Sequence, residues 1–314
     1  MLAVDHSTPE SRLIASVRKL CSPLDPIPSG IEPNIPELHG IRAVLFDVYG
    51  TLFVSHSGDI GTTSSEACET SFRQALAACG ITSNDTEVPL YISRFGELNR
   101  EQREALHQEG IDFPEMDVVE IWQQLLGELM ASHRIRLPQW GADRPEALIR
   151  QLAVEYEYRL NPAWPMPGLE STLDSLHLGG IKYGIISNAQ FYSPLLFTAL
   201  AGKSSKELGF QESLVIWSYE HRAVKPSAIL FEQASDRLEF IHGISANETL
   251  FVGNDKLKDV WAASQHGMKT ALFAGDSRSL RLHESDQRCT GFTPDLTITD
   301  LTQLVDSLGL PHSY

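Results

Sequence analysis

The sequence has few cysteines, and they do not form a metal-binding or redox pair. Cys21, Cys68, Cys79 and Cys289 lie far apart and show no CxxC spacing. Zinc sites and thioredoxin-like motifs place their ligands or thiols only a few residues apart. We therefore expect no zinc site of that type, and the simplest interpretation of the four cysteines is reduced thiols in a cytoplasmic protein.

Positive charge and long apolar runs are also scarce. The chain has 25 Lys and Arg against 41 Asp and Glu, which gives a formal net charge of −16. This balance argues against nonspecific binding to nucleic acid or to an anionic membrane. It also disfavours a polyanionic substrate, unless a local cationic pocket captures it. Charged residues interrupt the first 21 positions, so the N-terminus predicts neither a signal peptide nor a membrane span.

What the sequence does contain is typical of a soluble globular protein. Its 314 residues are 42% hydrophobic and 21% charged, enough for one large domain or two modest ones. After residue 163 the pattern alternates between helices and short apolar strands, with strands expected near 181–186, 213–217, 249–253, 269–273 and 295–298. Such alternation predicts an α/β fold, with a Rossmann-like doubly wound parallel sheet at its core. No sequence feature indicates an oligomeric state.

A long helical stretch interrupts this pattern after the first strand. Helices are expected from about 63 to 80, from 94 to 108, from 114 and from 145, each with apolar residues on one face. Short connections between them suggest a small all-helical bundle. We therefore predict three parts: an N-terminal helix and proline-rich extension (1–40), an α/β core (41–53 and 163–314) and an inserted helical domain (54–162).

The first strand ends in the run Ala43 to Leu52, AVLFDVYGTL, in which an apolar stretch stops abruptly at Asp47. A buried parallel strand that presents a carboxylate at the carboxyl edge of its sheet has this pattern. An aspartate in that position can act as a nucleophile and form a covalent intermediate. A strand that ends in an ordinary turn aspartate has the same local pattern.

Three further motifs follow in a fixed order. An apolar strand ends in Ser187-Asn188, Lys225-Pro226 precedes a helix, and a strand ending in Gly253-Asn254-Asp255 leads to Asp259. Together with the Asp47 run, these motifs resemble the haloacid dehalogenase superfamily of hydrolases, over roughly residues 41 to 300. The resemblance implies that the helical bundle is a cap that closes over the site and selects the substrate.

The resemblance also implies a role for each motif. Asp47 is the expected nucleophile, and Ser187 and Asn188 are expected to donate hydrogen bonds to the transferred group. Lys225 is expected to keep Asp47 ionised and to neutralise the transferring group. In the phosphatases of this superfamily, Mg²⁺ is held by the nucleophile, a backbone carbonyl and an acidic residue of the fourth motif. Here these would be Asp47, the carbonyl of Tyr49, and Asp255 or Asn254, while Asp259 would orient Lys225 or a metal-bound water.

Two residues depart from the phosphatase pattern. Most of those phosphatases carry a second aspartate two residues after the nucleophile as the acid and base, but this chain has Tyr49 there. Tyrosine has an ordinary pKa near 10 and is a poor base at neutral pH. The same position in the 2-haloacid dehalogenases is similar to this chain, and a departing halide needs no proton. Asn254 is the second departure, because many of the phosphatases have aspartate there.

The length of the fourth motif favours the phosphatases instead. Three residues lie between Asp255 and Asp259, as in the metal-dependent phosphatases, whereas the dehalogenases have a version one residue shorter and need no metal. The leading hypothesis is thus a Mg²⁺-dependent phosphatase of a small phosphorylated metabolite. A metal-independent 2-haloacid dehalogenase is the main alternative. A weakly active or non-enzymatic binding protein is a third, since the usual acid and base is missing.

Overall fold

A six-stranded parallel sheet forms the centre of one part of the molecule. The computed structural model describes residues 8–56 and 64–313. The strands lie in the order β10-β9-β8-β1-β6-β7, and all neighbouring pairs are parallel. They are β1 (Ala43–Phe46), β6 (Lys182–Ser187), β7 (Val215–Trp217), β8 (Thr249–Gly253), β9 (Lys269–Phe273) and β10 (Leu296–Ile298). The predicted parallel α/β core is confirmed.

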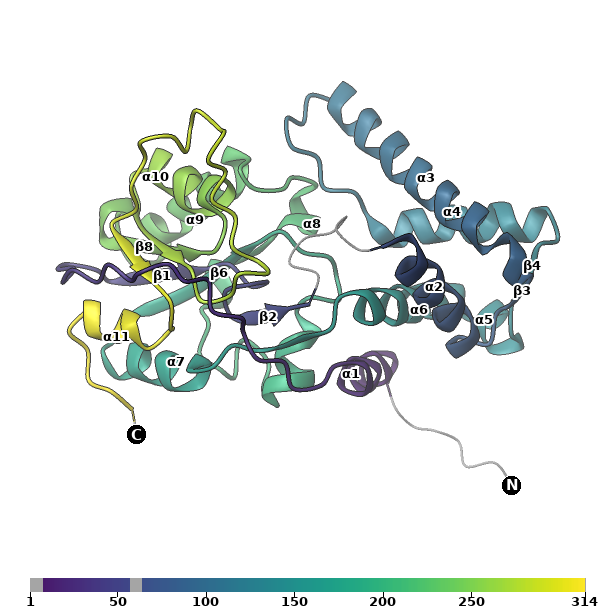
Figure 1. The fold of residues 1–314 in the computed structure, drawn as a ribbon, viewed down its shortest axis with the longest axis horizontal. Coiled ribbons are helices and arrows are strands. Elements are labelled where there is room, and N and C mark those ends of the chain that lie inside the picture. The colour runs from purple at the N-terminus through teal and green to yellow at the C-terminus, as the bar shows by residue number, and fades with distance from the viewer. Residues whose placement is uncertain (1–7, 57–63, 314) are drawn as a thin grey trace.

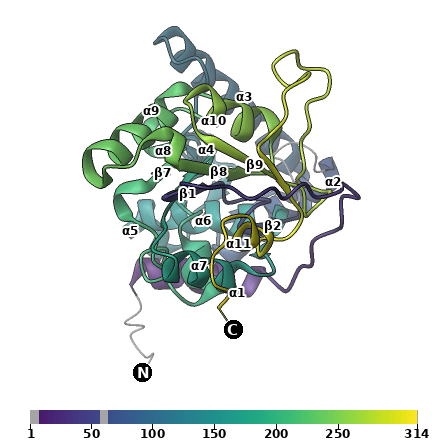
Figure 2. The same ribbon diagram turned by 90° about the vertical axis from the view of Figure 1, so that its left-hand side faces the viewer.

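Helices cover both faces of this sheet (Figures 1 and 2). One face carries α9 (Ala228–Arg237) and α10 (Ala262–Gln265), and the other carries α7 (Leu169–Leu178) and α11 (Gln303–Ser307). Successive residues of β1 point to opposite faces. Ala43 and Leu45 belong to the apolar cluster beneath α9, whereas Val44 and Phe46 belong to the larger cluster that includes α7. Both faces of the sheet are therefore shielded from water, which explains why β1 is apolar throughout.

Between β2 (Phe53–Ser55) and β5 (Ala163–Pro165) the chain leaves the sheet and forms a block of helices, here called the helical insertion (residues 65–160). β2 and β5 pair antiparallel, so the chain leaves and returns side by side. The helices are α2 (Ser65–Ala78), α3 (Val88–Gln108), α4 (Val118–Ala131), α5 (Gln139–Asp143) and α6 (Pro145–Leu160), with a short antiparallel pair, β3 (Thr82–Ser83) and β4 (Ile135–Arg136).

The predicted apolar faces of these helices make the core of the insertion. Phe72 of α2 and Trp122 of α4 are both buried, with ring centroids 5.2 Å apart. Tyr156 of α6 packs edge-on against Trp122 at 5.5 Å, and Phe95 of α3 lies 4.7 Å from the same indole. Four helices thus converge on one aromatic centre, and such pairs stabilise a core beyond their buried area.

Some predicted boundaries differ from the structure for local reasons. α3 begins at Val88 rather than near 94, because Pro89 falls in its first turn, where a missing N–H costs nothing. α4 begins at Val118 rather than near Pro114, because the Asp117 side chain caps it by accepting from Val119 N and Glu120 N. The helix that alternation predicts between the strands near 181–186 and 213–217 begins with turns at 191–194 and leads into the π-helix η2 (Phe197–Ala201).

The N-terminal extension contacts both parts of the molecule. Its helix α1 (Pro9–Leu20) packs against α6 of the insertion and against η2 of the core. The extended segment that follows α1 reaches the edge strand β10, where Asn34 forms an antiparallel bridge with Thr297. No helix in the described part of the chain is both long and apolar enough to cross a membrane.

Candidate active site

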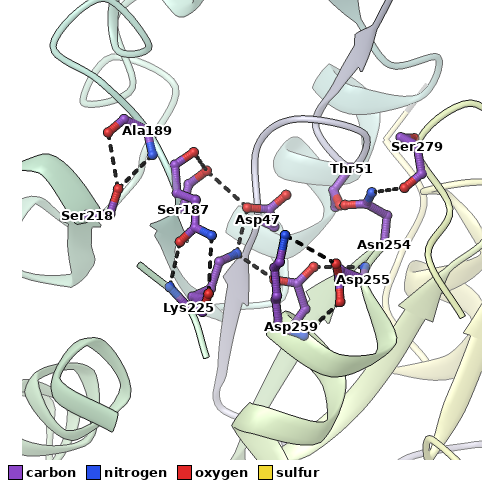
Figure 3. A network of polar contacts seen from close by, with 12 residues as sticks. Asp47, Thr51, Ser187, Ala189, Ser218, Lys225, Asn254, Asp255, Asp259 and Ser279 are labelled. Carbon is purple, nitrogen blue, oxygen red and sulfur yellow. Dashed lines mark hydrogen bonds and ion pairs between the residues drawn. The ribbon is translucent and has the colours of Figure 1, made fainter. Parts of the chain in front are cut away.

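The candidate nucleophile lies at the carboxyl edge of the sheet. Asp47 follows β1 directly, and its backbone N–H donates to the Val252 carbonyl of the neighbouring β8 at 2.9 Å. Ser187 ends β6, the neighbour of β1 on the other side, and Asn254 follows β8. Three adjacent strands therefore deliver these side chains to one place, as expected for a parallel sheet. Figure 3 shows them together with Lys225 and Asp259.

One lysine lies between two carboxylates at the centre of this group. Lys225 is buried, and its Nζ is 2.7 Å from Asp47 Oδ1 and 2.5 Å from Asp259 Oδ1. Burial by itself would lower the pKa of Lys225, but the charges of Asp259 and Asp47 outweigh burial and raise it. The ammonium therefore stays charged between the two carboxyl groups.

The second motif holds both Asp47 and the Lys225 loop. Ser187 Oγ donates to Asp47 Oδ1 at 3.0 Å. Asn188 Oδ1 accepts from the Lys225 backbone N–H at 2.7 Å. Both contacts of the Asp47 carboxylate thus fall on Oδ1, and Oδ2 has no hydrogen-bond partner within residues 8–56 and 64–313. This leaves one oxygen for an incoming atom or a cation.

The two candidate metal ligands of the fourth motif have different surroundings. Asn254 lies against the first motif, where its Oδ1 accepts from Thr51 Oγ1 at 3.3 Å and its Nδ2 donates to the Ser279 carbonyl at 2.6 Å. The Asp255 carboxylate instead caps a π-helical turn, η6 (Lys256–Trp261). It also lies 2.9 Å from His283 Nε2. Both side chains therefore have partners, but those of Asp255 are its own helical turn and His283, whereas Asn254 contacts Thr51 of the loop that follows Asp47.

The surroundings of Tyr49 do not suit a catalytic acid or base. Its hydroxyl lies 3.0 Å from Ser193 Oγ. Burial, and then the nearby charge of Glu157, raise the pKa of Tyr49 above its ordinary value. Its phenol therefore stays protonated at neutral pH, where it cannot accept a proton, and it is a weaker acid than free tyrosine.

Comparison with known proteins agrees with this arrangement. A family model of haloacid dehalogenase-like hydrolases matches residues 41–267. The chain belongs to this family. It is therefore an enzyme of the hydrolase class, and the resemblance inferred from the four motifs is confirmed.

Individual relatives are more distant. A ribulose-1,5-bisphosphate 5-phosphatase from Halopiger xanaduensis is 27% identical over 143 residues, which is 45% of this chain and 55% of that protein. The hydrolase thus spans about half the length of this relative. A solved 2-haloacid dehalogenase from Pseudomonas syringae pv. Tomato DC3000 has a TM-score of 0.55 and 18% identity, over 86% of this chain and 98% of the other. This likeness extends the shared fold to most of the chain.

The side chains beside Asp47 carry oxygen atoms of the kind that Mg²⁺ prefers. In the described part of the hydrolase, no three His, Cys, Asp or Glu side chains form a ready-made metal cluster. Mg²⁺ does not require one, since it commonly takes one or two carboxylates together with water and substrate oxygens. Asp47 Oδ2 supplies a carboxylate oxygen that has no partner among the residues described by the structure, and Asn254 lies beside the loop that follows Asp47.

Several side chains around the site were not anticipated from the sequence. Thr51 and Ser279 orient Asn254, and His283 pairs with Asp255. The Thr51 contact had a signal, because Thr51 belongs to the Asp47 motif. Ser279 and His283 lie in an irregular segment with no motif, so only the tertiary fold brings them here.

Gly253 allows the close approach of Asp259, which yields a prediction. A Cβ at position 253 would lie 2.4 Å from Asp259 Cγ. We expect Gly253→Ala to displace Asp259 from Lys225, and to lower both kcat and the free energy of unfolding, the latter by about 1–3 kcal/mol. Urea denaturation and steady-state assays measure the two effects.

Gly127→Ala is the matched control. Gly127 lies within α4, and nothing lies within 4 Å of the added methyl group. We expect this variant to keep its activity and to be as stable as the wild type or about 1 kcal/mol more stable. Equal behaviour of the two variants would contradict the assigned role of Gly253.

Proposed function

We propose that this hydrolase is a Mg²⁺-dependent phosphatase of a small phosphorylated metabolite. The observation that carries the proposal is the Asp47 carboxylate, held at Oδ1 by Ser187 and Lys225 with Oδ2 unpartnered beside Asn254. The similarity to a ribulose-1,5-bisphosphate 5-phosphatase supports phosphate esters as the substrate class. All four cysteines are free thiols, which supports a reducing compartment such as the cytoplasm as part of the same proposal.

In the proposed reaction, Asp47 attacks phosphorus and forms an aspartyl-phosphate, while the ester P–O bond breaks and the leaving group departs as an alkoxide or phenolate that takes a proton from solvent. Water then attacks the phosphorus and releases phosphate, which regenerates the carboxylate. Ser187 and Asn188 donate to the transferred group, and the Lys225 ammonium offsets its negative charge. Asp259 holds Lys225 in place through its 2.5 Å contact. This buried cation supplies local positive charge in a chain whose formal net charge is −16.

Asp47, the carbonyl of Tyr49 and Asn254 would hold Mg²⁺, and Asp255 would serve mainly as a helix cap. When bound, the ion would neutralise charge on the phosphoryl oxygens. The helical insertion, within the proposed domain 54–162, would act as a cap over the core domain of 41–53 and 163–314. Its attachment through β2 and β5, directly beside the first motif, supports that role.

A metal-independent 2-haloacid dehalogenase is the second candidate, and Tyr49 favours it. A halide leaves without a proton, so a protonated phenol at this position costs a dehalogenase nothing. The deciding experiment is a panel of phosphate esters, with and without Mg²⁺, assayed beside 2-chloropropionate. Phosphate release that requires Mg²⁺ supports the phosphatase. Halide release that survives chelation, with no phosphate release from any ester, overturns it in favour of the dehalogenase.

Tyr49 also predicts which esters the proposed phosphatase prefers. Because its phenol is a poor proton donor to an alkoxide, esters with acidic leaving groups, such as aryl and acyl phosphates, are expected to react faster than alkyl phosphates. A plot of log(kcat/KM) against leaving-group pKa measures this preference. Tyr49→Asp is expected to reduce the slope by supplying a carboxyl group. A flat wild-type plot, with chemistry rate-limiting, would mean that another residue donates the proton.

A further inference from the structure

The segment that follows Ser187-Asn188 is the place where the helical insertion rests on the core. In this segment, Gln190 Nε2 donates to Glu115 Oε1 at 2.9 Å and to the Met116 carbonyl at 2.7 Å. Gln190 Oε1 accepts from Val118 N at 3.2 Å. All three partners lie between α3 and α4 or at the start of α4, in a stretch here called the cap loop (residues 113–118). One core side chain therefore fixes this loop at three points.

Glu115 continues this contact toward the active site. Its Oε2 lies 2.5 Å from Ser218 Oγ, and Ser218 Oγ in turn accepts from Ala189 N at 2.8 Å. Ala189 directly follows Asn188, so two hydrogen bonds separate the Glu115 carboxyl group from the backbone of the second motif. Figure 3 shows Ser218 and Ala189 on this side of the site.

The cap loop also holds the core loop that presents Lys225. Glu115 N donates to the Arg222 carbonyl at 3.0 Å, and Val224 N donates to the Phe113 carbonyl at 2.8 Å. Lys225 is the next residue along the chain. A single short stretch of the insertion therefore contacts both core loops that surround Asp47, one on the Asn188 side and one on the Lys225 side.

We propose that Glu115 is a positioning residue that holds the cap loop against the two core loops that carry Asn188 and Lys225. The position of the insertion on the core then affects the geometry around Asp47. This proposal rests on the roles proposed above for Asn188 and Lys225. Glu115 itself touches none of the reacting atoms, and acts through Ser218 and through its own backbone.

The protonation state of Glu115 changes this contact. Burial raises the pKa of Glu115 to about 7, although hydrogen bonds from Ser218 and Gln190 oppose the shift. The other charged or titratable groups near it are Arg103 on α3, which lowers its pKa, Asp117 on the cap loop, which raises it, and Tyr192 on the core.

When Glu115 is ionised, the Ser218 hydroxyl donates to it. When Glu115 is protonated it can donate to Ser218 Oγ, and the Ser218 hydroxyl is then free to donate to the Ala189 carbonyl, 3.1 Å away. Protonation thus adds a hydrogen bond at Ala189. Because the pKa is raised, the added contact is present below neutral pH and is lost as the pH rises through about 7.

The test compares Glu115→Ala and Glu115→Gln with the wild type. Loss of one strong hydrogen bond predicts that Glu115→Ala lowers kcat roughly 10- to 100-fold, with a smaller change in KM. Glu115→Gln keeps an acceptor for Gln190 and a donor for Ser218, and is expected to remain within about threefold of the wild type. The kcat of the wild type should change as Glu115 titrates near pH 7, whereas the kcat of Glu115→Gln should show no such change. Glu104→Gln, at an exposed position of α3, is the control and should match the wild type throughout.

Hydrogen exchange without substrate gives a second readout that does not depend on the reaction. In Glu115→Ala, the backbone amides of 187–193 and 222–225 are expected to exchange faster, while those of β8 are unchanged. Unchanged exchange in both loops, or equal loss of kcat in Glu115→Ala and Glu115→Gln, would overturn the proposal. If the wild type releases no phosphate from any ester, the phosphatase assignment is wrong, and the exchange comparison alone then decides the coupling.

Discussion

Asp47→Asn is expected to abolish turnover, with kcat reduced by roughly 10⁴-fold or more, as for the loss of a residue on which the chemical step depends. An amide is a far weaker nucleophile than a carboxylate and carries no charge to attract a cation. The amide is also a poorer partner for Lys225, whose Nζ lies 2.7 Å from Asp47 Oδ1. Steady-state rates with an aryl phosphate measure the loss, and circular dichroism checks the fold of the variant.

Two further measurements make this result specific. Asp236→Asn changes an exposed aspartate on α9 in the same way and should leave kcat unchanged. Rapid quenching of the wild type during turnover should trap phosphate on the residue-47 peptide, and the variant should yield none. Near wild-type rates in Asp47→Asn, or phosphate trapped on a different residue, would show that the covalent mechanism is wrong.

Lys225→Met should give the largest loss of stability. It leaves Asp47 and Asp259 buried without the ammonium that both contact. Removing one partner of a buried ion pair costs roughly 3–5 kcal/mol, because the remaining charge is neither solvated nor paired. Activity is expected to fall by at least about 10²- to 10³-fold, as when a donor to developing charge is removed. Guanidinium denaturation and steady-state assays measure these effects.

The pH dependence of this loss has a definite sign. The pKa of Lys225 is raised in the folded protein, so its contribution is complete below the ordinary lysine value of about 10.4 and is lost only at higher pH. In Lys225→Met the two carboxylates repel, and their protonation relieves the strain. Burial already raises the pKa of Asp259 to about 7 with Lys225 in place, and loss of the ammonium raises it further. The stability deficit should therefore shrink as the pH falls to about 7 and below.

Matched variants separate the charge effect from simple loss of packing. Lys203→Met, at an exposed position, should leave stability and activity unchanged. Adding Asp259→Asn to Lys225→Met removes one of the two repelling charges, and should restore part of the stability but not the activity. A double variant no more stable than Lys225→Met at neutral pH would contradict the electrostatic origin of the loss.

The sequence predicts those site residues that directly follow or end an apolar strand. Asp47 and Ser187 could be located because an apolar run that ends in a polar residue defines a strand and its carboxyl edge at once. The pairing of Lys225 with Asp259 could be expected only through the family pattern, since 34 residues separate them and no local rule joins them.

Other features depend on tertiary structure, and the sequence did not anticipate them. An aspartate at the start of a helical turn has the same pattern whether it binds a metal or caps the turn, so the sequence left Asp255 and Asn254 as alternatives. Their surroundings differ because Ser279 and His283, from a segment without a motif, pack beside them. Glu115 likewise lies in an ordinary loop, and only the fold places it against Ser218.

The attachment of the N-terminal helix has a consequence for movement of the insertion. The paired strands β2 and β5 connect the core to the insertion, and a movement of the insertion would turn about them as a hinge. Below that hinge in Figures 1 and 2, α1 holds both bodies: Ser16 accepts from Gln151 of α6, and Arg18 donates to the Thr198 carbonyl of η2. Above it, next to α8 (Ser218–His221), the cap loop holds the core.

A body fastened on both sides of its hinge cannot swing freely in either direction. Rotation one way stretches the contacts of α1, and rotation the other way stretches those of the cap loop. If the insertion acts as the cap proposed above, opening would have to break one complete set of these hydrogen bonds. For that role we expect an entrance that is either open or shut, without stable intermediate positions.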